Sequence, residues 1–195
     1  MFYILLISLI VIALDQTTKL LVMHYMTLGE KISIIPGFFG FEYLTNDGVA
    51  FSFKISDKPW VNLTIQLTIV AIALVFLILE ARKIKNFKTR KWLSFALAFL
   101  IGGAIGNCID RIFYPTHEVT DFLSFIIYYP MIKGGKLIID STPFAIFNIA
   151  DSAVNVGVFM LLIWLIFMEP KISKKENKDE TKENPDETVD MGAIK

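Results

Sequence analysis

The sequence contains very few residues that could build a metal site or a disulfide. Its 195 residues include one cysteine, Cys108, and two histidines, His24 and His117. A single cysteine excludes an intramolecular disulfide and a cysteine metal cluster, and we interpret Cys108 as a small core residue. The formal net charge is zero, whereas a nucleic-acid-binding protein normally carries a basic excess. We therefore expect no metal, no cofactor and no nucleic-acid partner.

Common catalytic and phosphate-binding motifs are also missing. The sequence contains no His-x-x-x-His, no Gly-x-Ser-x-Gly and no Gly-x-x-x-x-Gly-Lys-Ser/Thr motif. Its one glycine-rich stretch, Gly-Gly-Ala-Ile-Gly at 102–106, lies within an apolar run. Glycines in that setting more often permit close helix packing than bind a phosphate.

Long runs of apolar residues dominate the sequence. Apolar residues make up 54% of the chain, and the mean hydropathy is +0.57. A helix needs roughly 20 apolar residues to cross the hydrocarbon core of a bilayer. Four segments meet this requirement, at approximately 2–26, 60–79, 92–112 and 144–168. We predict a membrane α-helical fold, a bundle of four transmembrane helices, in which the first span is retained because no basic region precedes it.

The charged residues predict how the chain crosses the membrane. The loop between the second and third spans, Glu-Ala-Arg-Lys-Ile-Lys-Asn-Phe-Lys-Thr-Arg-Lys, is short and strongly basic, and such loops remain in the cytoplasm. Both termini are then cytoplasmic, while 27–59 and 113–143 lie on the outer side of the membrane. The tail at 169–195 is rich in charge and poor in apolar residues, so we expect it to be disordered.

The two outer segments predict a small β-rich platform. The segment 31–53 is dense in Ile, Phe and Tyr and is interrupted by Pro36, Gly37, Gly40 and an Asn-Asp-Gly turn signal, a pattern typical of short strands. The segment 126–140 predicts a hairpin around Gly134-Gly135, with Pro130 restricting its strand to a sheet edge. The integral membrane domain therefore covers 1–168 and combines the bundle with this platform.

Polar residues within the spans repeat at helical spacing. Asp15 and Lys19 are four positions apart, which allows an ion pair on one helix face. Lipid offers no hydrogen-bond partners, so such groups must face the bundle interior or water. Two further polar faces lie at the outer end of the third span and in the fourth span: Asn107, Asp110 and Arg111, and Asn148, Asp151 and Asn155. A purely structural explanation is an Asp15–Lys19 pair, an Asp110–Arg111 pair and an asparagine bridge that hold the bundle together.

Asp121 and Asp151 differ because neither has a basic residue at helical spacing. Asp121 lies just after the third span and Asp151 about two turns into the fourth, so both lie near the outer membrane boundary. Two carboxyl groups within a few ångströms share one proton because both cannot ionise. The ionised group can then activate a water for attack on a peptide carbonyl, while the protonated group donates to the carbonyl oxygen. This is the chemistry of an aspartic peptidase.

Five short motifs follow one another along the chain: Asp-Gln-Thr-Thr-Lys at 15–19, Asn-Asp-Gly-Val-Ala-Phe at 46–51, Gly-Asn-Cys-Ile-Asp-Arg at 106–111, Val-Thr-Asp-Phe at 119–122 and Phe-Asn-Ile-Ala-Asp at 147–151. In this order, and with four spans, the sequence resembles the lipoprotein signal peptidases, or signal peptidase II, of bacterial inner membranes. The resemblance extends to about Met168. It implies an aspartic endopeptidase that removes signal peptides from diacylglyceryl-modified prolipoproteins by cutting before the lipidated cysteine.

The resemblance also implies roles for individual residues. The catalytic pair of the family matches Asp121 and Asp151, the two carboxylates selected above. Polar residues that surround this pair or shape the site match a larger set: Asn107, Asp110, Arg111, Asn148, Asp15, Lys19 and Asn46. The implied partners are prolipoproteins, whose lipid tails would lie between the spans, membrane lipid, and inhibitors such as the cyclic peptide globomycin.

One feature departs from the family pattern, and two other functions remain as alternatives. The stretch between the two aspartates is longer than expected, because of the hairpin around Gly134-Gly135. The first alternative is a small proton- or ion-coupled transporter that uses intramembrane aspartates as relays, although no inverted repeat is visible. The second is a non-catalytic assembly or lipid-binding protein of the envelope.

Overall fold

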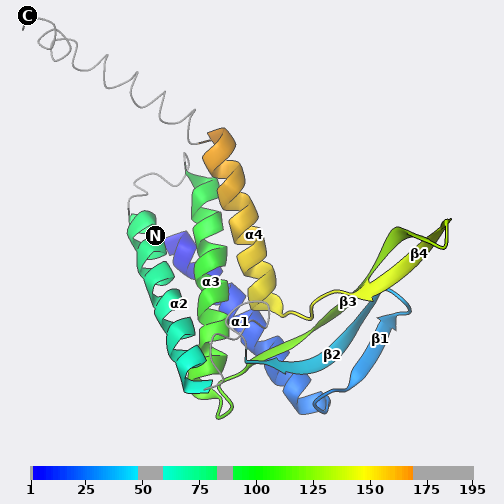
Figure 1. The fold of residues 1–195 in the computed structure, drawn as a ribbon. Coiled ribbons are helices and arrows are strands. Elements are labelled where there is room, and N and C mark those ends of the chain that lie inside the picture. Colours follow the sequence, from blue (N-terminus) through cyan, green and yellow to red (C-terminus); the bar gives the residue numbers. More distant parts are fainter. Residues whose placement is uncertain (1, 48–58, 83–89, 169–195) are drawn as a thin grey trace, which may run out of the picture.

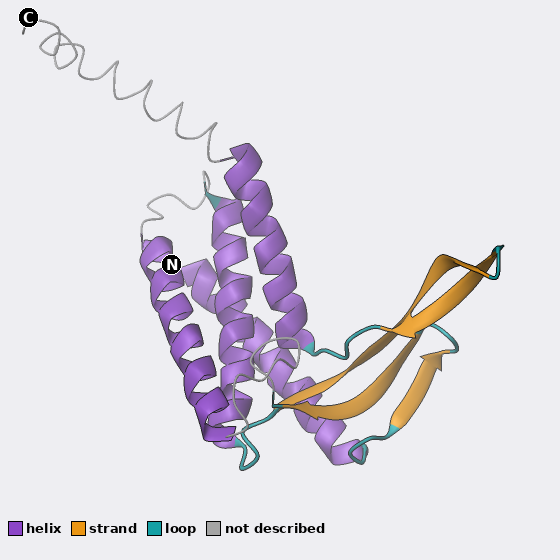
Figure 2. Cartoon of the chain, viewed as in Figure 1, coloured by secondary structure: helices purple, strands orange, loops and turns teal. Residues whose placement is uncertain are grey.

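The computed structural model describes residues 2–47, 59–82 and 90–168, and for part of 59–82 it describes the backbone alone. Within these ranges the elements follow one another as α1 (Phe2–Tyr25), β1 (Lys31–Ile35), β2 (Phe39–Asn46), α2 (Pro59–Arg82), α3 (Lys91–Phe113), β3 (Val119–Lys133), β4 (Lys136–Pro143) and α4 (Ile149–Ile163). The helices form one bundle, and the strands form a twisted sheet that extends from one end of it (Figures 1 and 2). Each pair of strands therefore joins the end of one helix to the start of the next.

Helix α3 lies at the centre of the bundle, where it packs against α1, α2 and α4. Small residues make this close packing possible. A Cβ atom added to Gly102 would lie 2.8 Å from the Cβ of Val11 on α1, and one added to Gly103 would collide with the carbonyl oxygen of Ala150 on α4. The interpretation of the glycine-rich stretch as a helix-packing surface is confirmed.

Three helices are long and apolar enough to cross a membrane within the described part of the chain. They are α1, α3, and α4 together with its π-helical last turn, Trp164–Met168. These helices coincide with the predicted first, third and fourth spans. The predicted second span lies within α2, a helix of 24 residues.

The prediction for the start of the fourth span is wrong. The helix begins at Ile149 rather than at Phe144, because Asn148 adopts an extended backbone (φ −125°, ψ −174°) and its side chain accepts a hydrogen bond from the backbone N–H of Asp151. Asparagine is favoured at this capping position because it satisfies a helix donor that has no partner in the helix. Asp151 therefore lies in the first turn of α4, not two turns inside it, and Asn155, one turn further along the helix, is exposed.

The predicted β-rich platform is an antiparallel sheet with the strand order β1-β2-β3-β4. Strands β3 and β4 form the predicted hairpin, and its turn residues Gly134 and Gly135 have φ values of +60° and +76°, a region that glycine adopts readily. Pro130 pairs with Ile139 of β4 and lies beyond Phe125, the last residue of β3 that pairs with β2. It therefore lies where β3 has a neighbour on one side only, as predicted.

Apolar contacts fasten the sheet to the bundle. Val22 and Met26, at the end of α1, form a buried cluster with Phe122 of β3. This cluster fixes the first residues of β3 against α1.

Three predicted features lie outside the described residues: part of the second motif (48–51), most of the basic loop (83–89) and the charged tail (169–195).

Candidate active site

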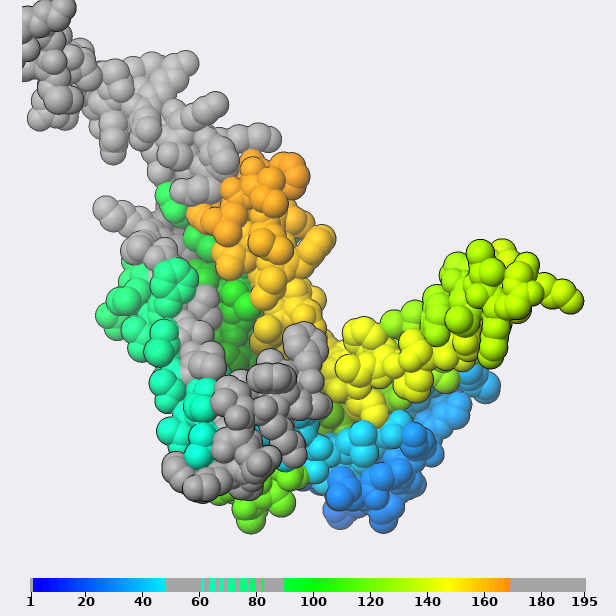
Figure 3. Space-filling view, in the orientation of Figure 1, coloured from blue at the N-terminus to red at the C-terminus, as the bar shows by residue number. Residues whose placement is uncertain are grey.

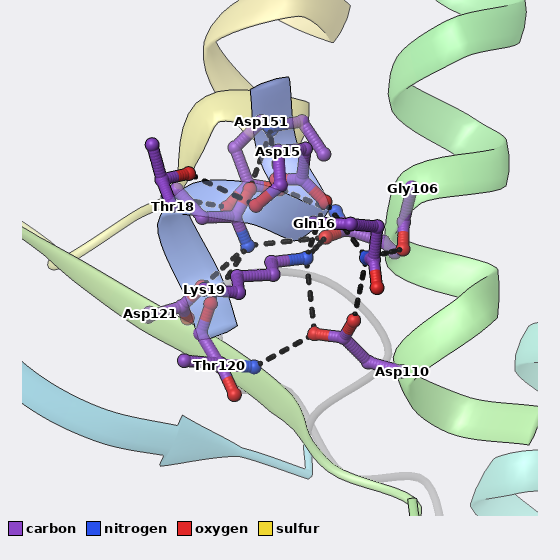
Figure 4. Close-up of polar contacts among 12 residues, drawn as sticks. Asp15, Gln16, Thr18, Lys19, Gly106, Asp110, Thr120, Asp121 and Asp151 are labelled. Atoms are coloured by element: carbon purple, nitrogen blue, oxygen red, sulfur yellow. Dashed lines mark hydrogen bonds and ion pairs between the residues drawn. The ribbon is translucent and has the colours of Figure 1, made fainter. Parts of the chain in front are cut away.

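Asp121 and Asp151 come from different elements and are linked by one asparagine. Asp121 lies near the start of β3 and Asp151 in the first turn of α4. The Nδ2 of Asn148 donates to Oδ1 of Asp121 at 2.7 Å, while its Oδ1 accepts from the backbone N–H of Asp151 at 2.8 Å. Figure 4 shows both aspartates beside the polar cluster between α1 and α3. One asparagine side chain thus connects the carboxylate of Asp121 on β3 to the main chain of Asp151 on α4.

Neutral amide groups surround both carboxylates. Oδ2 of Asp121 accepts from the side-chain amide of Asn46 at 3.0 Å. Oδ1 of Asp151 accepts from the side-chain amide of Asn107 at 2.8 Å, and its Oδ2 lies 3.3 Å from the backbone nitrogen of Asn148. Amide donors orient a carboxylate without supplying a counter-charge, so they leave it able to exchange a proton.

The surroundings of Asp121 favour its protonated form. Asp121 is buried, with only 3% of the residue exposed to solvent. Burial and then the negative charge of Asp151 raise the pKa of Asp121 to about 7, against the opposing effects of the Asn46 and Asn148 hydrogen bonds and the Lys19 charge. Asp121 therefore retains a proton over much of the neutral range. Asp151 is only partly buried and lies in the first turn of α4.

A buried charged cluster lies directly behind this pair. The ammonium of Lys19 is 2.8 Å from Oδ2 of Asp15, 3.0 Å from Oδ2 of Asp110 and 3.0 Å from Oδ1 of Asn107. All three charged side chains are fully buried. The predicted Asp15–Lys19 ion pair is confirmed. The predicted Asp110–Arg111 pair is wrong, because Lys19 on the neighbouring helix takes the place of Arg111.

The two acids of this cluster also bind the backbone next to each candidate catalytic residue. Oδ1 of Asp15 accepts from the backbone N–H of Ala150 at 2.8 Å. Oδ2 of Asp110 accepts from the backbone N–H of Thr120 at 3.0 Å. Ala150 directly precedes Asp151, and Thr120 directly precedes Asp121. One lysine therefore holds two carboxylates, each of which fixes the main chain beside one member of the pair.

Two further residues lie beside the cluster, one from the predicted set and one outside it. Arg111 is buried at the same end of α3, with Nη1 3.5 Å from the carbonyl oxygen of Asn107, so it adjoins the cluster. Gln16 was not predicted, yet its Nε2 lies 2.9 Å from Oδ1 of Asp110 and 3.1 Å from the carbonyl oxygen of Gly106. A polar residue next to Asp15 inside a membrane-length helix was the signal that could have identified it.

Comparison with known proteins identifies the family. The family model described as "Signal peptidase (SPase) II" matches residues 7–167. The chain belongs to the signal peptidase II family. A lipoprotein signal peptidase of Listeria monocytogenes serotype 4a (strain HCC23) is 38% identical over 174 residues, covering 88% of this chain and 97% of its own length. One from Maridesulfovibrio salexigens is 37% identical over 159 residues, covering 80% and 90%.

Solved structures agree with this assignment. A bacterial membrane enzyme determined by the in meso method at 1.9 Å resolution has 29% identity and a TM-score of 0.66, with 86% of this chain and 94% of that chain covered. A second such enzyme, at 2.3 Å resolution, has 31% identity and the same TM-score of 0.66. The chain is therefore an aspartic peptidase and a multi-pass membrane protein. Neither the transporter nor the non-catalytic alternative is supported, since the matched family consists of peptidases.

Proposed function

We propose that this signal peptidase II removes signal peptides from prolipoproteins, cutting before the diacylglyceryl-modified cysteine, with Asp121 and Asp151 as the catalytic pair. The observation that carries this proposal is the shared asparagine. Asn148 is hydrogen-bonded to the side chain of Asp121 and to the backbone of Asp151, so both carboxyl groups belong to one network. The raised pKa of Asp121, about 7, gives the pair one readily available proton.

The two aspartates take different parts in the reaction. Asp151 acts as the base and removes a proton from a water, whose oxygen attacks the scissile carbonyl carbon. Asp121 gives its proton to the carbonyl oxygen, which produces a neutral gem-diol. Asp151 then gives its proton to the leaving nitrogen, and Asp121 takes a proton back from one gem-diol hydroxyl as the C–N bond breaks. The products are the carboxylic acid of the signal peptide and the amine of the new N-terminal cysteine, and Asp121 is again protonated. No net proton is consumed by the pair, so it is ready for the next cycle.

The supporting residues act by orientation. Asn46, Asn107 and Asn148 aim the oxygens of the two carboxylates through their amide donors. The cluster of Asp15, Lys19 and Asp110 fixes the main chain on which both aspartates lie. Positioned groups of this kind lower the barrier because the reacting atoms do not have to be ordered during the reaction.

An apolar groove next to the pair suits a lipid-modified substrate. It measures about 340 Å³ and is lined only by apolar side chains, among them Phe125, Phe144 and Phe147. Phe147 directly precedes Asn148, so the groove adjoins the catalytic network. We assign it to apolar parts of the prolipoprotein around the modified cysteine, with membrane lipid beside it. Globomycin-type cyclic peptides would compete for the same region.

In the proposed orientation α2 also crosses the inner membrane, which brings the number of spans to four. The basic loop that follows Arg82 and both termini are then cytoplasmic, while the sheet and the catalytic pair lie at the periplasmic face. Reporter fusions after residues 88 and 145 test this arrangement. A cytoplasmic reporter should be active at 88 and inactive at 145, and the opposite pattern would contradict the orientation.

The activity is tested with purified full-length protein in detergent or lipid vesicles and a diacylglyceryl-modified prolipoprotein peptide. The expected product is a peptide that begins with the lipidated cysteine, identified by mass spectrometry. The same peptide without the lipid is the matched substrate control. Cleavage at a different bond, or equal cleavage of the unlipidated peptide, would contradict the proposed specificity.

A further inference from the structure

The hairpin that lengthens the region between the two aspartates forms a projecting arm, residues 126–143. The outer half of β3, from Ile126 to Lys133, pairs there only with β4, because the pairing of β3 with β2 ends at Phe125. Figures 1 and 3 show the arm standing clear of the helices, on the side of the bundle where α4 begins. The phenolic oxygen of Tyr128 donates to the carbonyl oxygen of Gly37 at 2.6 Å and so braces the base of the arm against the β1–β2 turn.

The pairing register gives the arm two chemically different faces. Directly paired residues lie on the same face, and successive residues alternate between faces. The face that contains Tyr128 also contains Pro130, Ile132, Leu137, Ile139 and Ser141 and carries no charge. The opposite face carries every charged residue of the arm, which are Lys133, Lys136 and Asp140. The arm therefore has one face without charge and one face on which these charges lie among apolar residues such as Met131 and Ile138.

The uncharged face is open to its surroundings. Ile132, Leu137 and Ile139 are exposed to 75%, 75% and 76%. These three aliphatic side chains come from both strands of one face, so they form a continuous apolar surface. Continuous exposed apolar surface of this kind marks a site of contact with a partner or a membrane.

We propose that the uncharged face of the arm lies in the outer boundary layer of the lipid bilayer, next to the active site. A short segment, 144–148, joins the arm to α4, a helix apolar enough to cross the membrane, so the arm cannot move far from the bilayer. Figure 1 shows the tip of the arm at the level of α4 rather than beyond the end of the bundle. The exposed apolar surface of α4, which includes Val158, Phe159 and Leu162, faces the same lipid.

The remaining residues of the arm fit an interfacial position. Lys133 and Lys136 flank the tip on the opposite face, where their ammonium groups can reach anionic lipid phosphates while the chain below stays in apolar surroundings. Tyrosines are enriched at membrane interfaces, and Tyr128 and Tyr129 lie near the base of the arm. The outer edges of a two-stranded ribbon leave backbone donors and acceptors unpaired, so the arm belongs at the polar boundary and not in the hydrocarbon centre.

Two neighbouring positions on opposite faces provide a matched test. In full-length protein with Cys108→Ser, single cysteines are introduced by Ile139→Cys or Asp140→Cys and labelled with an environment-sensitive fluorophore. The labelled proteins are reconstituted in vesicles of phosphatidylethanolamine and phosphatidylglycerol, with or without doxyl-labelled lipid. The probe at 139 should emit at shorter wavelength and be quenched several-fold more strongly by the doxyl lipid than the probe at 140.

The other outcomes overturn the proposal. A probe at 139 that emits as in water means that the face does not contact lipid. A blue-shifted probe at 139 that doxyl lipid does not quench, and whose emission depends on the protein-to-lipid ratio, means that a second copy of the chain covers the face. Equal quenching at both positions means that the arm has no preferred face. Unchanged circular dichroism and detergent elution volume of both variants establish that the comparison concerns folded protein.

Discussion

The ammonium of Lys19 lies 3.0 Å from the side-chain oxygen of Asn107, and the amide of Asn107 donates to Asp151. A single asparagine thus connects the buried charged cluster of α1 and α3 to the candidate catalytic pair. The cluster also binds the backbone before each aspartate, through Asp15 at Ala150 and Asp110 at Thr120. Removing a charge from this cluster should therefore affect the geometry of catalysis as well as the stability of the bundle.

The first prediction concerns the pair itself. Asp121→Asn and Asp151→Asn should each lower turnover about 10³-fold, because a positioned acid or base contributes roughly 10²–10⁴-fold to the rate. Each substitution keeps the side-chain volume and removes one proton-exchanging group. Turnover of the lipidated peptide is the measurement. Asp140→Asn, on the arm, is the matched control and should cleave normally, while normal turnover in either pair variant would remove that residue from the chemistry.

The second prediction concerns pH. Asp121 must be protonated to donate, and its pKa is raised to about 7 by burial and by the charge of Asp151. The catalytic rate should therefore fall as the pH rises through about 7. The stability of the wild-type protein should fall in the same direction. The pKa of Asp121 is 3.8 as its ordinary value and about 7 in the folded state, so between these two pH values the folded protein loses stability as the pH rises. Asp121→Asn should thus become more stable relative to the wild-type protein over that range.

A thermal unfolding series between pH 4 and pH 9 measures this difference directly. The gain of Asp121→Asn over the wild-type protein should rise between about pH 4 and pH 7 and then level off. A constant difference over the whole range would mean that the carboxyl group titrates as it does in the unfolded chain. A rate that stays flat up to pH 9 would mean that the proton donated in the reaction comes from another group.

The third prediction concerns the buried cluster. Lys19→Met removes the only ammonium that the structure describes between Asp15 and Asp110 and leaves two acids without it. Breaking a buried ion pair in this way typically costs about 3–5 kcal/mol, so unfolding in detergent should occur at a clearly lower temperature. Lys31→Met is the control, because Lys31 is 71% exposed and its pair with Glu42 lies at the surface, where such pairs contribute about 1 kcal/mol or less. Equal unfolding temperatures for the two variants would contradict the role of the cluster.

Much of the fold followed from local patterns in the sequence. The apolar runs predicted helices that the structure contains, and the Gly134-Gly135 signal predicted the β3–β4 hairpin. The i, i+4 spacing predicted the Asp15–Lys19 pair. These features depend on residues close together in the chain, for which helical or strand spacing alone determines which side chains can meet.

The errors arose where distant segments compete for the same residues. Asp110 is adjacent to Arg111 in sequence, yet Lys19, 91 positions away, is its partner because α1 packs closely against α3. The start of α4 was misplaced because apolar content was weighed above the capping potential of Asn148. Gln16 was overlooked because its partners, Gly106 and Asp110, lie on another helix. Contacts between helices decide such cases, and sequence spacing within one helix carries no information about them.

The last prediction concerns the arm. Replacing residues 132–137 by an Asn-Gly turn would join Met131 to Ile138, which are already paired at the same kind of hydrogen-bonded position as Lys133 and Lys136, and so shorten the ribbon without changing its register. Asp121 belongs to the part of β3 that pairs with β2, where Leu44 is its partner, so the catalytic pair should keep its geometry. The shortened enzyme should therefore cleave a minimal lipopeptide at the wild-type rate and change its preference among longer prolipoproteins.

Competition between two full-length prolipoproteins that differ only after the modified cysteine measures that preference. The catalytic rate on the minimal lipopeptide serves as the internal control, because it reports the pair without contacts to the arm. A folded, shortened enzyme that is inactive even on the minimal lipopeptide would mean that the arm helps to hold Asp121 in place. That result is not expected, because Asn46 and Asn148, which bind the two oxygens of Asp121, both lie outside the shortened segment.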